Sequence, residues 1–246
     1  MRRVLAGIGV VLTALFLYLF TLPRAGLPDG TFTVHGAVAT GVAATRYRAG
    51  PIRRALLGEG WRDAWSMPIQ VPVLDPDTFA GGLTPLRTGS GNQTRSLHLR
   101  GADGRDYVFR VTDKDQGRGL SPLTRATWGR VRQDQVGALH PAAAIVAAGL
   151  MDATGLPHTR PRLVAMPDHP RLAGHRAAFA GRLGIIEENP RHGFAGADRV
   201  VDTEELGPVH PDSLHARRYL AARLMDVYLG DWDRHEGQWR WGRMDD

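Results

Sequence analysis

The chain contains no cysteine among its 246 residues. This absence excludes disulfide bonds, zinc sites built on thiolates and catalysis by a cysteine nucleophile. It does not define the compartment, because an exported domain can fold without disulfides. Lysine is almost missing as well, since Lys114 is the single lysine among the 31 lysine and arginine residues. Positive charge in this chain is therefore carried by arginine.

The formal net charge is +6 at pH 7. Arginine keeps its charge and forms paired hydrogen bonds to carboxylates or phosphates, so this excess fits anionic partners. The alternative interpretation is a GC-rich genome, which encodes arginine where other genomes encode lysine. No stripe of arginine and aromatic residues of the nucleic-acid-binding type is present, so we expect no nucleic-acid partner.

Two common hydrolase signatures are missing. The ten histidines contain neither an H-E-x-x-H motif nor a tight H-x-H pair, so a zinc hydrolase is not indicated. No G-x-S-x-G segment is present, which argues against a serine hydrolase of the nucleophile-elbow type. Hydrophobic residues make up 43% of the chain and charged residues 23%, which is typical of a folded domain with a sizeable core.

Residues 4–22 form an uninterrupted run without charge. Nineteen helical residues at about 1.5 Å each approach the roughly 30 Å hydrocarbon core of a bilayer. The run favours an uncleaved signal anchor over a cleaved signal peptide, whose apolar core is usually about 7–15 residues long. Arg2 and Arg3 precede it and Arg24 alone follows it, so the positive-inside rule predicts a cytoplasmic N-terminus. We expect a single-pass protein of the bacterial inner membrane with an extracytoplasmic domain.

The rest of the chain divides into a linker and a domain. Residues 23–66 are rich in glycine, alanine and arginine and are predicted to be a stalk with one short amphipathic helix over 49–65, broken at Gly58 and Gly60. Residues 67–246 are predicted to be the domain. Its first half is rich in strands, and its second half begins with a helix near Pro141.

The clearest local prediction is a β-hairpin over residues 96–111. Apolar and polar residues alternate on both sides of Asp103-Gly104, a dipeptide that favours tight turns. The alternation places Tyr107, Phe109 and Val111 on one face and Arg110 on the other. A loop of small residues over 83–94 is predicted to precede the hairpin.

Further along the chain, the sequence predicts helices and strands in blocks. Two helices are expected over 123–140 and 141–155, followed by buried strands within 160–166 and 178–190. A long helix is expected from Asp212 or Ser213 to Gly230, with a short strand after it at 238–242. This order predicts an α+β fold and not a regular doubly wound sheet.

The segment GDWDRHEGQ at residues 230–238 follows that helix directly. It resembles the catalytic loop of atypical protein-kinase-like enzymes, namely the secretory-pathway casein-kinase type, the HipA-like toxin kinases and the phosphatidylinositol kinases. The resemblance implies that Asp233 accepts the proton of a substrate hydroxyl, that Gln238 holds a metal, and that Arg234 and His235 brace the loop. The alternative is a polar turn that caps the preceding helix, with Trp232, Trp239 and Trp241 packed around it.

The part of the domain that precedes residue 141 fits the same resemblance in outline. Gly89, Ser90 and Gly91 correspond to the loop that presents backbone N–H groups to phosphates, and the resemblance therefore implies ATP and Mg²⁺ as cofactors. Arg110 occupies the place of the lysine that pairs with phosphate, and Asp134 is the best carboxylate for the helix that pairs with that cation. An ordinary hairpin connector and a structural arginine are the alternatives.

Residues 80–246 resemble most closely a domain of bacterial envelope proteins that has no established activity. A kinase carries a second metal-binding aspartate about 18 or more residues after the catalytic one, whereas this chain ends thirteen residues after Asp233. We therefore expect a two-lobed kinase-like domain that is incomplete at its C-terminus, with residues 67–140 as the first lobe and 141–246 as part of the second. The hypothesis is a degenerate or truncated pseudokinase that binds nucleotide or phosphate. A non-catalytic module that binds a protein partner in the cell envelope is the alternative.

Overall fold

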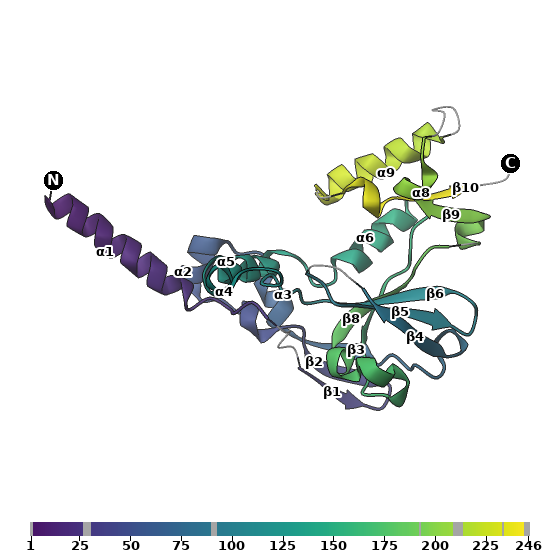
Figure 1. Ribbon diagram of the computed structural model, residues 1–246, viewed down its shortest axis with the longest axis horizontal. Helices are drawn as coiled ribbons and strands as arrows, with labels where there is room; N and C mark the ends of the chain where they lie inside the picture. Colours follow the sequence, from purple (N-terminus) through teal and green to yellow (C-terminus); the bar gives the residue numbers. More distant parts are fainter. Residues whose placement is uncertain are drawn as a thin grey trace.

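A computed structural model describes residues 2–26, 31–89, 93–191, 193–208, 214–232 and 234–243. Helix α1 (Arg2–Leu19) projects away from the remainder of the molecule, and none of its side chains is buried (Figure 1). It is long and apolar enough to cross a membrane, a property that a secretory signal sequence shares. The fold is α+β, as the sequence predicts.

The central element is an antiparallel sheet of five strands in the order β4-β5-β6-β8-β7. These strands are β4 (Leu83–Thr88), β5 (Ser96–Gly101), β6 (Asp106–Val111), β7 (Arg162–Ala165) and β8 (Leu183–Glu188). The predicted hairpin is confirmed, with Leu97 opposite Phe109 and Leu99 opposite Tyr107. Strand β4 was predicted as a loop; it pairs with β5 through a register shift beside Pro85.

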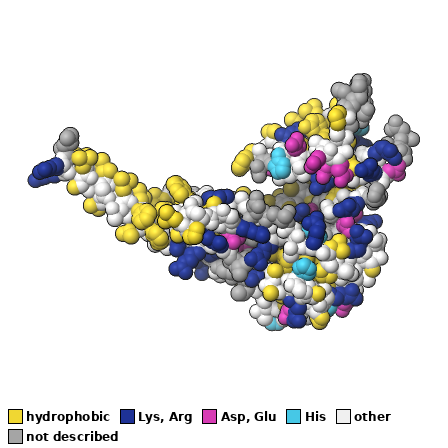
Figure 2. Space-filling view, viewed as in Figure 1, with side chains coloured by type: hydrophobic (Ala, Val, Ile, Leu, Met, Phe, Trp, Pro, Cys, Tyr) yellow, Lys and Arg dark blue, Asp and Glu magenta, His cyan; other side chains and the backbone are white. Residues whose placement is uncertain are grey.

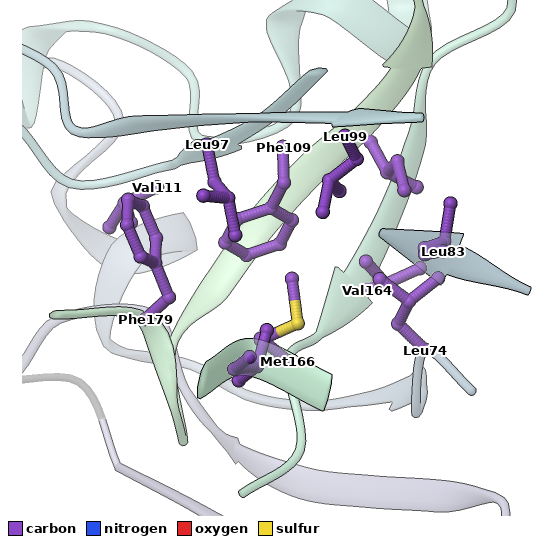
Figure 3. Close-up of a cluster of buried hydrophobic side chains, with 11 residues drawn as sticks. Leu74, Leu83, Leu97, Leu99, Phe109, Val111, Val164, Met166 and Phe179 are labelled. Atoms are coloured by element: carbon purple, nitrogen blue, oxygen red, sulfur yellow. The ribbon is translucent and has the colours of Figure 1, made fainter. Parts of the chain in front are cut away.

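One face of this sheet is covered and forms the main core (Figure 3). Side chains from β5 and β6 pack against the segment around Met166 and against Phe179 of α7 (Arg176–Phe179). Phe109 and Leu97 are completely buried there. Because successive side chains of a strand point to opposite faces, the same alternation turns Arg110 to the other face, as predicted.

A second core contains the segment that was predicted to be a stalk. Strands β1 (Thr31–His35) and β2 (Val38–Val42) form a three-stranded antiparallel sheet with β3 (Pro68–Pro72). Tyr47 and Trp65 are buried in contact with each other, with ring centroids 4.9 Å apart. Residues 31–66 are therefore part of the folded body, because their aromatic side chains fill its interior.

The helices are mostly short. They are α2 (Pro51–Leu57), α3 (Arg62–Ser66), α4 (Pro122–Ala126), α5 (Trp128–Gln135), α6 (Ala143–Asp152), α8 (Thr203–Leu206) and α9 (Ala216–Leu229). The predicted amphipathic helix is two helices, separated at Gly58 and Gly60 as expected. Gly60 has a φ of 53°, and a Cβ on it would lie 2.7 Å from Cα of Ala138, so this crossing requires glycine.

The last part of the chain adds a two-stranded sheet of β9 (Arg199–Asp202) and β10 (Arg240–Arg243). Strand β10 confirms the predicted final strand. Strand β9 was not predicted, because its partner lies on the far side of α9 in the sequence. In the view of Figure 1, the unit formed by α8, α9, β9 and β10 is seen above α6 and the main sheet.

Helix α5 carries the most buried charge of the described chain. Asp134 is fully buried and accepts hydrogen bonds from Arg62 at 3.0 and 2.7 Å, and it also binds Arg53 of α2. The neighbouring Gln133 donates to the Tyr47 hydroxyl at 2.6 Å and to the Lys114 carbonyl at 2.7 Å. A buried charge is stable only where it is paired and hydrogen-bonded, so these contacts hold residues 31–66 against α5.

Replacing Asp134 by Asn should lower the free energy of unfolding by about 3–5 kcal/mol, because it leaves two guanidinium groups without a buried counter-charge. The measurement is urea unfolding of the whole chain in detergent, followed by tryptophan fluorescence. The control is Asp63→Asn, whose side chain is 73% exposed and pairs with Arg54; it should cost about 1 kcal/mol or less. Equal losses in the two variants would contradict the assigned role of Asp134.

Candidate functional site

The segment at residues 230–238, here called the charged loop, begins directly after a helix, as the sequence predicts. Helix α9 ends at Gly230, which has a φ of 69°, a left-handed conformation that favours glycine. The next residue, Asp231, donates its backbone N–H to the carbonyl of Asp226 at 2.8 Å. The predicted caps at the start of this helix, Asp212 and Ser213, lie outside the described residues.

Arg234 braces the loop against the helix. Its Nε lies 3.2 Å from Oδ1 of Asp226, and its Nη2 lies 3.1 Å from Oδ2 of Asp231. Asp226 is 5% exposed, and its other carboxylate oxygen accepts a hydrogen bond from Arg223 at 2.8 Å. The sequence interpretation missed Asp226. Its only local signal is a carboxylate three residues after an arginine on the same face of the helix.

Aromatic rings pack on the other side of these arginines. The guanidinium groups of Arg223 and Arg234 lie 5.7 and 5.6 Å from the ring centroid of Trp239, within cation–π range. Trp241 stacks on Tyr219 and Trp239, in agreement with the predicted packing role of these tryptophans. The same prediction is wrong for Trp232, which is 91% exposed.

The remaining residues of the loop are placed less tightly. Asp233, the predicted base, lies outside the described residues, so its role stays a prediction. His235 and Gln238 are exposed at the two ends of the short 3₁₀ helix η7 (Glu236–Gln238). Within the described ranges, no three histidine, aspartate or glutamate side chains gather as a metal site would require.

The glycine segment begins at Gly89, and Ser90 and Gly91 lie outside the described residues. The backbone N–H of Gly89 donates to the carbonyl of Ser96 at 2.8 Å. This N–H is therefore not available to a phosphate, contrary to the prediction. A Cβ on Gly89 would collide with the side chain of Ser96, which is a structural reason for glycine at this position.

Arg110 and Asp134 do not form the cation–carboxylate pair that the resemblance implies. Arg110 is paired with Glu187 of β8, and its side chain is 48% exposed. Asp134 lies in the interior, where Arg62 and Arg53 bind it.

Burial lowers the pKa of His98, which lies on the same sheet face as Arg110. The positive charges of Arg87 and Arg110 lower this pKa further.

A hollow of about 440 Å³ lies beside the glycine segment. The residues that line it are Thr88, Gly89, Gln93, Arg95, Ser96, Asp115, Arg118, Arg125, Ala178 and Phe179. Asp115 is the carboxylate of this lining, and it lies 3.3 Å from Arg125. Arg110 does not line this hollow.

Arg95 is the residue of the hollow that favours an anion. Within the described part of the chain, the guanidinium of Arg95 makes no hydrogen bond or ion pair, and the side chain is half-buried. A guanidinium group in this setting can bind phosphate through two parallel hydrogen bonds. Sequence reasoning missed Arg95, Arg118 and Arg125, because three separate segments bring them together only in the folded chain.

Comparison of the chain with protein-family models, with curated proteins and with solved structures gives no match.

Replacing Asp226 by Asn should loosen the charged loop, because Arg223 and Arg234 both lose the ionised acceptor that holds them. We expect faster trypsin cleavage after Arg234, measured by mass spectrometry during limited proteolysis of the folded chain. Asp231→Asn is the matched control, since the Asp231 side chain is 36% exposed and binds Arg234 alone. Cleavage at the same rate in both variants would contradict the bracing role of Asp226.

Proposed function

We propose that this chain is a membrane-anchored protein whose domain is a degenerate relative of the kinase-like fold and binds a phosphate-bearing ligand. The observation that carries the proposal is the hollow beside Gly89, which is lined by the half-buried Arg95. Arginine is suited to phosphate because its planar group matches two phosphate oxygens. A nucleotide and a free phosphate share this chemistry.

The arrangement of the main sheet supports the kinase-like part of the proposal. Strands β4 and β5 flank the glycine segment, and β5 pairs with β6, which carries Arg110. Strand β8 lies on the other side of β6. The glycine segment and the strand of Arg110, which the resemblance places at a nucleotide, thus belong to one sheet.

The ion pairs of the domain favour ligand binding over phosphoryl transfer. In kinases the phosphate-pairing cation is positioned by a carboxylate on the neighbouring helix. In this chain that helix carboxylate, Asp134, binds Arg62 and Arg53, and the corresponding cation, Arg110, binds Glu187. Both groups are therefore occupied by partners that a catalytic arrangement would not use.

The membrane anchor in the proposal is α1. Its apolar side chains are exposed along its whole length, which is unfavourable in water and favourable in lipid. Arg2 and Arg3 at its start support a cytoplasmic N-terminus, with the domain outside the cytoplasm of a bacterial cell. A cleaved signal sequence is the alternative for this helix.

Calorimetric titration of the whole chain in nanodiscs with ATP, with ATP and Mg²⁺, and with inorganic phosphate tests the proposed ligand. We expect binding, and we expect Arg95→Gln to weaken it about tenfold or more, because a charge-assisted hydrogen bond contributes about 1.5–3 kcal/mol. Arg160→Gln is the matched control, because Arg160 is 77% exposed and pairs with Asp152 away from the hollow.

Three results would contradict parts of this account. Absence of binding with all three ligands would refute the proposed function. Equal affinities for Arg95→Gln and the unaltered chain would place the ligand outside the hollow. Loss of binding in Asp233→Ala with no change in Arg95→Gln would assign the ligand to the charged loop.

A second function is favoured by the surface of α9. Its most exposed large side chains are Leu220 (58%), Leu224 (60%), Val227 (75%) and Tyr228 (74%), and Trp232 follows them at 91%. Figure 2 shows hydrophobic side chains gathered over this helix. Large exposed apolar patches mark contact surfaces, so a non-catalytic module that binds a protein partner in the envelope is the second candidate. It becomes the better supported function if the titrations detect no ligand.

A further inference from the structure

The end of α1 is held tightly by the body of the protein. Arg130 of α5 donates hydrogen bonds to the carbonyls of Phe20 at 3.1 Å and of Leu22 at 2.8 Å. Its guanidinium lies 5.4 Å from the centroid of the Phe20 ring. These contacts satisfy carbonyl groups that the end of a helix leaves without partners, and Leu22 is only 2% exposed. The domain therefore begins almost immediately after the apolar helix.

Geometry then limits how far the domain can stand from a membrane. Three residues, Phe20 to Leu22, separate the end of α1 from its buried contact, and three extended residues span at most about 10 Å. The 18 residues of α1 match roughly the thickness of the hydrocarbon core at about 1.5 Å per residue. If α1 spans a bilayer, the segment bound by Arg130 lies at the level of the headgroups.

The helices that bind the end of α1 also carry exposed apolar side chains. Leu123 of α4 is 77% exposed and Trp128 of α5 is 68% exposed. The same two helices contact the segment after α1, because Arg125 lies 3.4 Å from the Ala25 carbonyl and Arg130 binds Phe20 and Leu22. Apolar side chains on short helices are costly in water and stable at a membrane surface.

Helix α2 adds to the same region. It is joined to α5 through the contact of Arg53 with Asp134, and it exposes Ile52 at 68% and Leu56 at 54%. Figure 1 shows α2, α4 and α5 grouped where α1 meets the body. Figure 2 shows hydrophobic and basic side chains together at this junction.

The charges of the region complement an anionic surface. Arg24, Arg48 and Arg132 are exposed on these segments. The exposed carboxylates of Glu59 and Asp63 both pair with Arg54, so they do not offset those three arginines. Tryptophan and arginine together are characteristic of protein surfaces at the headgroup level, where the ring is half-solvated and the guanidinium reaches phosphates.

We propose that α2, α4 and α5 form a platform that lies on the same bilayer that α1 spans, with Leu123 and Trp128 inserted at the headgroup level and arginines bound to anionic lipid phosphates. The inference rests on the proposed membrane anchor. It goes further, because it fixes which face of the domain contacts the membrane and leaves α9 and its apolar surface away from the lipid.

Fluorescence quenching in liposomes tests the platform directly, because the chain has no cysteine of its own. The fluorophore NBD is attached to a single introduced cysteine in each of three variants, Leu12→Cys, Leu123→Cys and Val227→Cys. The native side chains at these positions are all at least 60% exposed. The whole chain is reconstituted in phosphatidylglycerol or phosphatidylcholine vesicles that contain nitroxide lipids. The label at 123 should be quenched most by headgroup-level nitroxides, the label at 12 by deep nitroxides, and the label at 227 by neither.

The labels separate failure of the platform from failure of the anchor. Absence of quenching at position 12 would refute the proposed anchor and, with it, the platform. Quenching at position 12 without quenching at position 123 would refute the platform alone, as would equal quenching at positions 123 and 227. Stronger quenching at position 123 in phosphatidylglycerol than in phosphatidylcholine supports binding to anionic lipid. Equal quenching in the two lipids would refute the binding of the arginines to anionic lipid phosphates.

Discussion

The arrangement of the molecule depends on the buried carboxylate of Asp134. Two arginines from the preceding segment bind it, Arg62 from α3 and Arg53 from α2, so residues 31–66 are held against α5. Helix α5 also carries Arg130, which binds the end of α1. Helix α5 thus joins the end of α1 to the folded body. Opening either contact would leave a buried charged group without its partner, and this cost resists bending.

The same pairing shapes the proposed function. With Asp134 committed to the interior and Arg110 paired with Glu187, the polar face of the main sheet lacks the cation–carboxylate pair expected of a kinase. Arg95 carries a positive charge in the hollow beside the glycine segment. An anion-binding domain held close to a membrane is the function that we propose from these contacts, and the apolar surface of α9 carries the second candidate, a module that binds a protein partner.

Local patterns predicted the parts of the fold that local forces decide. The alternation around Asp103 gave the hairpin and the outward face of Arg110, and Gly230 marked the end of α9, since strand period and glycine conformation act over a few residues. The sequence could not indicate the partners of Asp134, because Arg62 lies 72 residues away. Arg95 was missed because distant segments bring it to the hollow. Asp226 has its partners only three and eight residues away, but no motif marks it as their acceptor. Residues 31–66 were predicted as a stalk because their buried aromatic residues lie among glycine and arginine.

The central claim is that α5 holds the end of α1 in a fixed position against the folded body, and a distance measurement between spin labels tests it most directly. Labels at Leu17→Cys and Arg160→Cys lie on exposed side chains of α1 and of the body. Pulsed electron paramagnetic resonance of the whole chain in nanodiscs should give one narrow distance distribution, which broadens when Arg130→Gln removes the contacts to Phe20 and Leu22. A broad distribution in the chain that retains Arg130 would contradict the account.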